Sequence, residues 1–246
     1  MRKGQCGNAR DEAQKPRMAS AGRVRTGCPP SGEGRGITAT AAWGAFRGTA
    51  TRPGRTFVDL ATDRHAARHG AFVLFAVCIV YTLILLAFLG RGYPAAARSA
   101  LGLAVEDQYG LQVWYQAPLF FAVTCLTAAV LVLASRASGQ PVGFGLAFGR
   151  VSLATAVPFA STTMVVEAAA ALLLAAGLVR PADLLSWLTG PGAWFALLYQ
   201  VVGLAWLAAL VLVATRTTLG RGWRVSVPVA LLLLVVYGVP VALLIR

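Results

Sequence analysis

Glu167 is the residue in this chain with the clearest capacity for chemistry. It is the only charged residue inside any of the long apolar stretches, and it lies in the third of them, residues 151–179. A charged carboxylate at the centre of a bilayer costs at least about 2.5–3.5 kcal/mol, so such residues usually face the interior of a helix bundle. Ser161, Thr162 and Thr163 add hydroxyl groups to the same stretch. We therefore expect the rest of the chain to be organised around this stretch.

Gln200 is the expected neighbour of Glu167. If the third and fourth stretches pack as an antiparallel pair, Glu167 lies roughly 16 Å and Gln200 roughly 10 Å below the same membrane face, at 1.5 Å per residue. No Lys or Arg falls inside any stretch, and a single acid without a second ionisable group makes a poor proton relay. These features favour a neutral, hydrogen-bonded acid that links helices. The alternative is a small transporter or channel-like subunit that uses Glu167.

Other candidates for chemistry lack the necessary neighbours. Glu106 and Asp107 are adjacent, and we predict that they are solvated on an outer loop. His65 and His69 stand four apart without the acid of HExxH, and we interpret them as polar residues beside the membrane. The sequence contains no GxSxG and no P-loop, and its four cysteines form no CxxC pair: Cys6, Cys28, Cys78 and Cys125. We predict no catalytic residue, no metal and no cofactor; a membrane-embedded enzyme is the weakest alternative.

The composition predicts an integral membrane protein. The chain is 57% hydrophobic and 13% charged, with a mean hydropathy of +0.68. Soluble domains carry about 25% charged residues. Of the 22 Lys and Arg, 13 precede residue 70, so the net charge of +13 belongs mostly to the N-terminal region. We expect these charges to orient the chain and to meet anionic lipids, with no nucleic-acid partner. Two Lys against 20 Arg indicate a GC-rich, bacterial genome.

Five stretches are long enough to cross a bilayer as helices, which predicts an all-α bundle. Residues 1–38 are rich in Gly, Arg, Ser and Pro and have no hydrophobic period, so we predict a disordered basic tail before a membrane domain at 39–246. Phe57, Leu60 and Ala61 fall at i, i+3 and i+4, which predicts a short interfacial helix before the first span. The predicted spans are residues 71–89, 117–135, 151–179, 193–215 and 225–245.

Glycines and prolines set the expected limits of these spans. We expect Pro118 to open the second span, just after the aromatic pair Trp114 and Tyr115. Gly145 and Gly149 have the GxxxG spacing that can bring helices close. We favour loop glycines ahead of the third span, with a close helix contact as the alternative. Residues 181–189 suggest a second short piece at the interface.

The distribution of basic residues predicts the orientation. Five spans put the two termini on opposite faces. With the N-terminus inside, the cytoplasmic segments, including Arg136 and Arg150, hold 18 Lys and Arg and the outer segments hold four. The positive-inside rule therefore predicts a cytoplasmic N-terminus and an outer C-terminus, with the first span as a retained signal anchor.

Four short patterns stand in order along residues 40–246: the step from Pro53 to Phe57, Trp114-Tyr115-Gln116, Gly143-Phe-Gly145 and Leu219-Gly220. Together with the five predicted spans, their order resembles the Yip domain family of five-span membrane proteins in its bacterial form. It implies five helices and a cytoplasmic N-terminus. The Rab-type GTPase and vesicle roles of eukaryotic relatives do not transfer to bacteria, which lack that traffic, and the resemblance implies no catalytic residues.

From this resemblance we expect a non-enzymatic scaffold or membrane-organising component of the bacterial inner membrane. Its expected partners are membrane lipids and other membrane proteins or further copies of itself.

Overall fold

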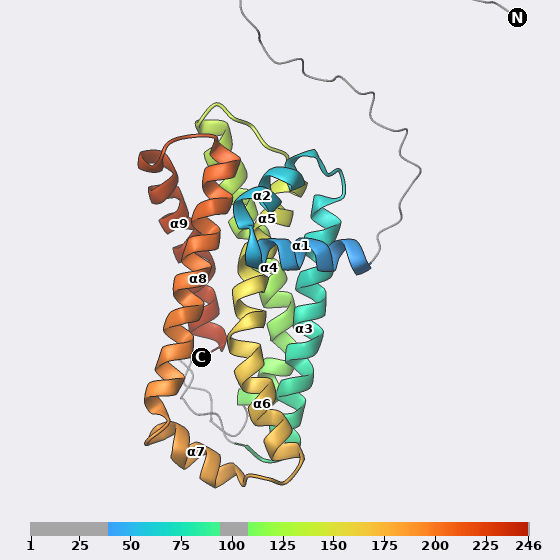
Figure 1. The fold of residues 1–246 in the computed structure, drawn as a ribbon, viewed down its shortest axis with the longest axis vertical. Coiled ribbons are helices and arrows are strands. Elements are labelled where there is room, and N and C mark those ends of the chain that lie inside the picture. The colour runs from blue at the N-terminus through green and yellow to red at the C-terminus, as the bar shows by residue number, and fades with distance from the viewer. Residues whose placement is uncertain (1–38, 94–107, 246) are drawn as a thin grey trace, which may run out of the picture. The chain divides into compact units, whose positions relative to one another are not determined.

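The computed structural model of this chain describes residues 39–93 and 108–245, and every regular element in these residues is helical (Figure 1). Three short elements precede the first long helix: α1 (Ala39–Thr51), α2 (Pro53–Asp59) and a 3-10 turn (Leu60–Thr62). The remaining helices are α3 (Ala66–Gly90), α4 (Gln108–Ala137), α5 (Phe144–Ser161), α6 (Thr163–Ala175), α7 (Pro181–Thr189), α8 (Ala193–Leu219) and α9 (Trp223–Ile245).

Five segments of the described chain are long and apolar enough to cross a membrane. They are α3, α4, α5 together with α6, α8, and the Trp223–Leu243 part of α9. This confirms the predicted all-α, five-span bundle, with the spans in the predicted order. The predicted tail at 1–38 and the outer acids Glu106 and Asp107 lie outside the described residues.

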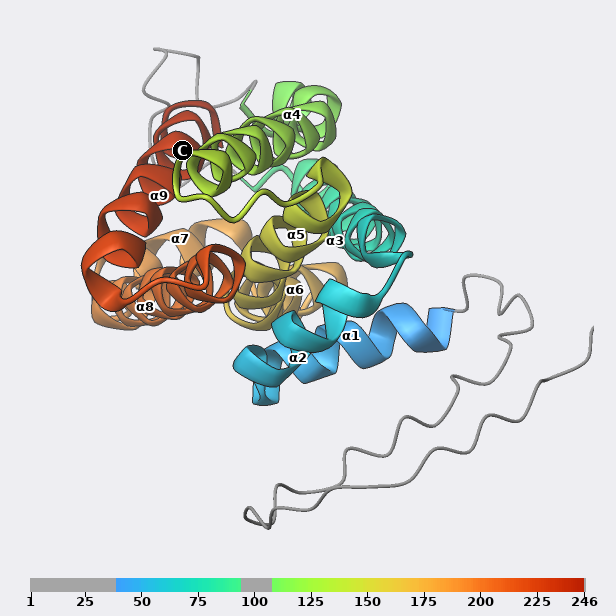
Figure 2. The same cartoon turned by 90° about the horizontal axis from the view of Figure 1, so that it is seen from above.

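Helix α5 lies at the centre of the bundle (Figure 2), packed against α3, α4 and α8. Every residue from Ala147 to Pro158 is buried. Most of these side chains are small, so three neighbouring helices can approach α5 from different sides. The third span is thus the organising element, as its sequence predicts.

The contact between α3 and α5 depends on two glycines. A Cβ added at Gly149 would lie 2.4 Å from the carbonyl oxygen of Ala66, and one added at Gly70 would lie 2.7 Å from the Cα of Gly149. Gly149 and Gly145 both lie inside α5, so the expectation of loop glycines is wrong. The GxxxG alternative is correct for Gly149, because only a residue without a side chain allows this backbone approach.

The third span is interrupted within the stretch that the sequence predicts, residues 151–179. The span starts earlier, at Phe144, and is broken at Thr162, with φ −114° and ψ −75°, four residues after Pro158. Proline has no N–H for the carbonyl one turn before it, and its ring bends the helix. The backbone N–H and the hydroxyl of Thr162 both donate to the carbonyl of Pro158, at 2.9 and 2.7 Å. These bonds stabilise the bend between α5 and α6.

The second span also begins earlier than predicted. Helix α4 is already formed at Gln108, and Pro118 lies inside it instead of opening it. A membrane helix tolerates an internal proline when neighbouring helices and side chains satisfy the freed backbone groups. The early start brings two glutamines, Gln108 and Gln112, into the bundle, and both are buried.

The segment ahead of α3 is helical, as predicted, and packs on the bundle through two of the three residues of its predicted apolar face. Phe57 is fully buried and Leu60 is 5% exposed, while Ala61, the third residue of the predicted apolar face, is exposed. Helix α2 packs against α1 and α8. Phe57 and Leu60 therefore cover the bundle.

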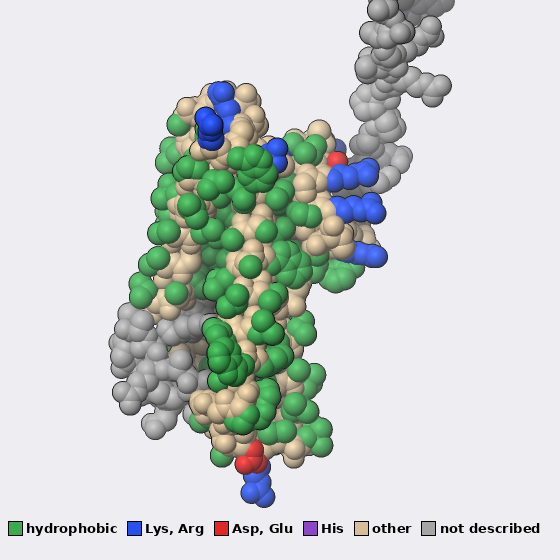
Figure 3. All heavy atoms as spheres, turned by 60° about the vertical axis from the view of Figure 1, so that its left-hand side comes forward, with side chains coloured by type: hydrophobic (Ala, Val, Ile, Leu, Met, Phe, Trp, Pro, Cys, Tyr) green, Lys and Arg blue, Asp and Glu red, His purple; other side chains and the backbone are tan. Residues whose placement is uncertain are grey.

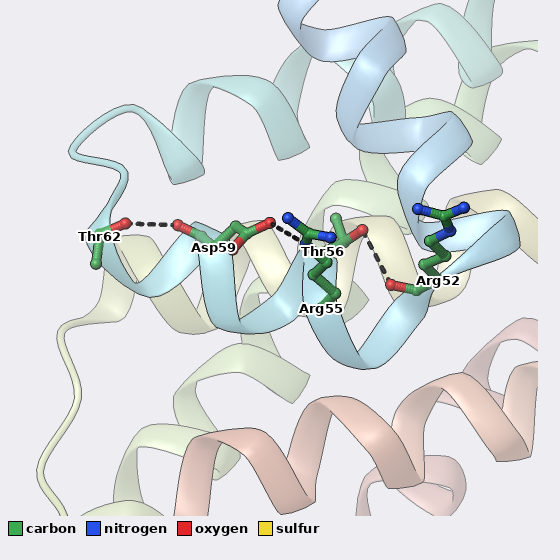
Figure 4. A network of polar contacts seen from close by, with 5 residues as sticks. All are labelled: Arg52, Arg55, Thr56, Asp59 and Thr62. Atoms are coloured by element: carbon green, nitrogen blue, oxygen red, sulfur yellow. Dashed lines mark hydrogen bonds and ion pairs between the residues drawn. The ribbon is translucent and has the colours of Figure 1, made fainter. Parts of the chain in front are cut away.

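The exposed side of α2 is held by local polar contacts (Figure 4). The hydroxyl of Thr56 donates to the carbonyl of Arg52 at 3.2 Å, and that of Thr62 donates to the carbonyl of Asp59 at 2.9 Å. Arg55 and Asp59 form an ion pair of 3.9 Å, with both side chains well exposed. Exposed pairs of this kind contribute about 0–1 kcal/mol, so the buried face accounts for most of the stability of this segment.

The outside of the bundle is apolar between its two ends (Figure 3). Leu172 is 70% exposed and Trp194 is 79% exposed, and many other large apolar side chains face outward. Exposed apolar area of this extent is unfavourable in water and favourable in lipid. The surface and the five long helices together indicate an integral membrane protein.

Charged side chains gather toward the ends of the bundle (Figure 3). At the end where α4 meets α5 and α8 meets α9, which we call the basic end, Arg221 donates to the carbonyl of Ser138 at 2.6 Å and joins the two loops. Arg180 and Asp183 lie at the opposite end, beside the start of α7, which we call the α7 end. There Arg91 donates to the carbonyl of Ala175.

Candidate functional site

All five spans contribute to one cavity of about 500 Å³ inside the bundle. Its volume lies within the range of about 300–1,000 Å³ that is typical of small-molecule sites. The cavity lies in the half of the bundle toward the α7 end, because α4 lines it through its first turns and α9 through its last turns. The lining residues include Tyr81 from α3, Gln108 and Gln112 from α4, Thr155 and Pro158 from α5, Glu167 from α6, Tyr199 and Gln200 from α8, and Tyr237 and Gly238 from α9.

The structure gathers four of the five predicted polar residues around this cavity. Glu167 and Gln200 both line it, on α6 and α8, and Thr162 and Thr163 line it at the break between α5 and α6. Ser161 is not among the lining residues. The antiparallel packing of the third and fourth spans thus brings the carboxyl and the amide to one space.

A glycine on α8 allows that helix to approach the break. A Cβ added at Gly203 would lie 2.7 Å from the hydroxyl oxygen of Thr162. Gln200 lies almost one helical turn before Gly203, and Glu167 lies more than one turn after Thr162. The close contact between Gly203 and Thr162 therefore fixes the separation of the two helix segments that carry the polar pair.

Helix α4 presents a row of buried glutamines that the sequence interpretation missed. Gln108, Gln112 and Gln116 follow one another at intervals of four, so they share one face, and they are 4%, 2% and 0% exposed. The side chain of Gln116 donates to the hydroxyl of Thr82 on α3 at 2.9 Å. The interval of four is visible in the sequence, but the expected start at residue 117 left all three outside the span.

Aromatic rings form much of the remaining wall. The rings of Tyr81 and Phe159 meet edge to face, with centroids 4.9 Å apart, and Phe120 lies 5.3 Å from Phe159. Tyr109, Tyr199 and Tyr237 also line the cavity. These rings come from five different helices, so the sequence alone gives no sign that they share a site.

Tyr93 joins a second aromatic group at the α7 end. Its ring lies 5.1 Å from that of Phe88 and 6.4 Å from that of Tyr109. Burial raises the pKa of Tyr93, and the nearby Glu167 and Tyr199 raise it further. The hydroxyl therefore stays protonated at neutral pH and remains a hydrogen-bond donor near the cavity.

The described lining of the cavity contains few charged groups. Among the lining residues that the structure describes, Glu167 is the only Asp, Glu, Lys or Arg. The other polar groups are amides, hydroxyls and phenols, which can donate and accept hydrogen bonds. This arrangement can bind a small organic molecule and orient its polar groups. Within residues 39–93 and 108–245, no three His, Cys, Asp or Glu residues are grouped closely enough to hold a metal ion.

A second buried charge lies outside the cavity, toward the basic end. Arg150 is 2% exposed. Its Nε and Nη2 donate to the carbonyl of Phe57 on α2, the former at 3.1 Å, and its Nη1 donates to the hydroxyl of Thr218 on α8 at 2.8 Å. The sequence interpretation placed Arg150 in a cytoplasmic loop. That placement is wrong, because α5 begins six residues earlier and carries Arg150 into the core.

The two histidines have different surroundings. Nε2 of His69 lies 3.1 Å from a carboxylate oxygen of Asp63, and the backbone N–H of His65 donates to the other carboxylate oxygen at 2.7 Å. Asp63 thus contacts two histidines at the start of α3, one through each carboxylate oxygen.

Cys78 and Cys125 are free thiols in the spans, and Cys6 and Cys28 lie outside the described residues.

No family model, no curated protein and no solved structure matches this chain. The functional proposal for this protein therefore rests on the geometry of the cavity and on the charge distribution of the bundle.

Proposed function

We propose that this protein is a membrane carrier that binds a small polar organic molecule in the cavity. The observation that supports this most strongly is that all five spans line one space whose polar groups include the only acid among the described lining residues. A scaffold has no need for a hollow interior, because its function resides on its surface. This proposal takes up the transporter alternative that uses Glu167.

The broken third span gives further support. Transporters commonly bind substrates where a spanning helix is discontinuous, because the irregular backbone there lines a cavity instead of facing lipid. Thr162 and Thr163, at the break between α5 and α6, are lining residues here. A bend at this point also provides a position about which α6 can move relative to α5.

We further propose that the protein resides in a bacterial inner membrane with its N-terminus in the cytoplasm. Two arginines of the described residues, Arg91 and Arg180, are at the α7 end. The other ten lie ahead of α3, at its start or toward the basic end. The positive-inside rule then puts the basic end in the cytoplasm. The cavity would lie in the outer half of the bilayer.

The scaffold role, the relationship to the Yip family and the absence of enzymatic activity remain predictions from the sequence.

A measurement of solute flux distinguishes a carrier from a scaffold. We would reconstitute the full chain in liposomes preloaded with a defined mixture of amines, amino acids, organic acids and sugars, and follow efflux by mass spectrometry. We expect at least one class of compound to leave faster than from protein-free liposomes.

Gly238→Leu is the variant that ties the flux to the cavity. Gly238 lines the cavity on α9, and a Cβ added there meets no described atom within 4 Å, so leucine adds volume beside the cavity without a close contact at its Cβ. We expect it to abolish the protein-dependent efflux. Gly44→Leu is the matched control, because Gly44 on α1 is equally open and lies away from the cavity. If no compound depends on the protein, or if Gly238→Leu transports normally, the carrier proposal is wrong and the scaffold prediction gains support.

A further inference from the structure

We infer that a groove on the surface of the bundle holds an acyl chain of an anionic phospholipid. The groove lies between α1, the first half of α3 and the residues on either side of the break between α5 and α6, and its volume is about 200 Å³. It shares no described lining residue with the cavity. The inference therefore goes beyond the proposed function and does not depend on it.

The described lining of the groove is apolar throughout. Every lining residue is an Ala, Val, Met, Phe or Trp, so none of them carries a charge. The indole N–H of Trp43 is the only conventional hydrogen-bond donor among these side chains. The groove therefore suits a hydrocarbon chain better than a polar solute.

Both walls of the groove leave large apolar side chains partly uncovered. On α1, Trp43 is 62% exposed, and its ring stacks on that of Phe46 with centroids 5.3 Å apart. On α3, Phe72 and Val80 are 43% and 46% exposed, and they are separated by roughly 12 Å at 1.5 Å per residue. Helix α1 runs across the direction of the long helices (Figure 1) and packs against α3 and α5. An acyl chain that runs along α3 would cover both walls.

Two exposed arginines, which we call the flanking arginines, adjoin the groove. Arg68 lies one turn before Phe72 on α3, and Arg47 lies one turn after Trp43 on α1. Residues four apart in a helix are neighbours on its surface, so each arginine lies next to a lining residue. Figure 3 shows blue arginine side chains gathered over this side of the bundle. A lipid whose chain occupies the groove would have its headgroup close to these positive charges.

The acids nearby do not neutralise the flanking arginines. Asp59 pairs with Arg55 at 3.9 Å, and Asp63 contacts His69 at 3.1 Å. In the part of the chain that the structure describes, neither flanking arginine forms an ion pair. A guanidinium binds phosphate through two parallel hydrogen bonds. An anionic headgroup leaves this attraction unopposed, whereas the choline of a zwitterionic headgroup brings a positive charge to a positive surface.

Trp43 connects the two parts of this site. Tryptophan side chains concentrate at the level of the lipid headgroups. Trp43 lines the groove and lies one turn from Arg47, so the flanking arginine meets the headgroup region while the groove continues along α3 into the hydrocarbon. This order matches that of a phospholipid, in which a charged phosphate is followed by apolar chains.

Native mass spectrometry of the full chain in detergent tests the preference for an anionic headgroup. Delipidated protein would be titrated with phosphatidylglycerol and with phosphatidylcholine of the same acyl chains. We expect phosphatidylglycerol to bind at least fivefold more tightly. Arg47→Gln combined with Arg68→Gln should weaken its binding at least fivefold. Arg136→Gln combined with Arg224→Gln is the matched control, because it removes the same charge from exposed residues toward the basic end, at α4 and α9.

Ala76→Phe tests whether the groove holds the acyl chain. Ala76 lines the groove on α3 and is partly exposed, so phenylalanine adds a ring where the chain would lie. We expect this variant to lose the preferential binding of phosphatidylglycerol. Ala209→Phe, on an exposed part of α8, should keep it. Circular dichroism would establish that each variant is folded.

Fluorescence quenching tests the site without a variant that fills the groove. Brominated acyl chains quench tryptophans that they contact. In phosphatidylcholine vesicles that contain a small fraction of chain-brominated phosphatidylglycerol, the wild type should lose a larger share of its fluorescence than Trp43→Phe, which keeps an aromatic wall. The same small fraction of brominated phosphatidylcholine should remove this difference.

Several results would overturn the inference. Equal binding of the two lipids, or equal weakening by the two double-arginine variants, would show that the groove has no anionic-lipid site of its own. Unchanged phosphatidylglycerol binding in Ala76→Phe would show that the chain lies elsewhere. A dimer that Ala76→Phe converts to a monomer, with lipid binding unchanged, would identify a second copy as the occupant. None of these results alters the flux experiment with Gly238→Leu, which decides the carrier proposal separately.

Discussion

Two charged residues inside the third span, Arg150 and Glu167, are accommodated by different means. Arg150 is buried, and its guanidinium reaches the carbonyl of Phe57 and the hydroxyl of Thr218. Glu167 instead faces a cavity, where it lies among neutral polar and aromatic side chains. The first arrangement joins three helices, and the second places a carboxyl among the lining residues of the cavity. The arginine therefore has a clear structural role, although the sequence directs attention to the acid.

We predict that Arg150→Gln destabilises the protein by about 2–5 kcal/mol, because it removes charge-assisted hydrogen bonds and leaves the buried carbonyl of Phe57 without its donor. Thermal unfolding in detergent, followed by circular dichroism, measures the effect. Arg136→Gln is the matched control, because Arg136 is exposed near the end of α4. If both variants unfold at the wild-type temperature, Arg150 does not hold α2 on the bundle.

At the scale of the element, small residues determine which helices can touch. Gly149 brings α5 against α3, and Gly203 brings α8 against the break at Thr162. In lipid, helices gain little from hydrophobic burial against one another, so close packing at small residues contributes much of their association. These contacts set the spacing of the helices around the cavity.

We predict that Gly149→Val separates α3 from α5 and destabilises the bundle by about 1–3 kcal/mol or more, as overpacking does in other cores. Gly44→Val on α1 is the control, because a Cβ there meets nothing within 4 Å of the described atoms. Chemical denaturation in mixed micelles compares the two variants. A loss of stability in Gly44→Val equal to that in Gly149→Val would show that helix propensity, and not the contact with Ala66, is responsible.

At the scale of the whole molecule, most arginines of the described residues lie toward one end of the five spans. The described chain enters α3 at the basic end and leaves α9 at the α7 end. A cavity in the half toward the α7 end then faces the outside of the cell, if the basic end is cytoplasmic.

We predict that the C-terminus lies outside the cytoplasm. Alkaline phosphatase fused after Arg246 should be active in a bacterial host, and green fluorescent protein fused at the same position should remain dark. The physical reason is the excess of arginine at the basic end, which resists translocation. Reversed results from the two reporters would place the cavity in the cytoplasmic half of the membrane.

Periodicity and composition were sufficient to predict the membrane class, the number of spans and their order. Long apolar stretches have few alternatives to spanning helices, because lipid leaves no other partner for backbone polar groups. The same local rules predicted the first residues of some helices incorrectly. Pro118 and Gly149 appear in sequence as a helix start and a loop residue, yet both lie inside helices, because neighbouring helices pack around them.

The cavity could not be predicted from the sequence, because it forms only in the tertiary structure. Its lining residues come from five spans that are far apart in the chain, and their side chains meet only because α5 packs against three helices and bends at Thr162. From the sequence, Glu167 was recognisable because a charge in an apolar stretch is costly. No comparable signal pointed to the buried glutamines of α4, to the tyrosines of the cavity or to Arg150. Uncharged polar residues and residues near the end of a span are common, so their presence does not predict burial. Packing alone determined which of them face the same space as Glu167.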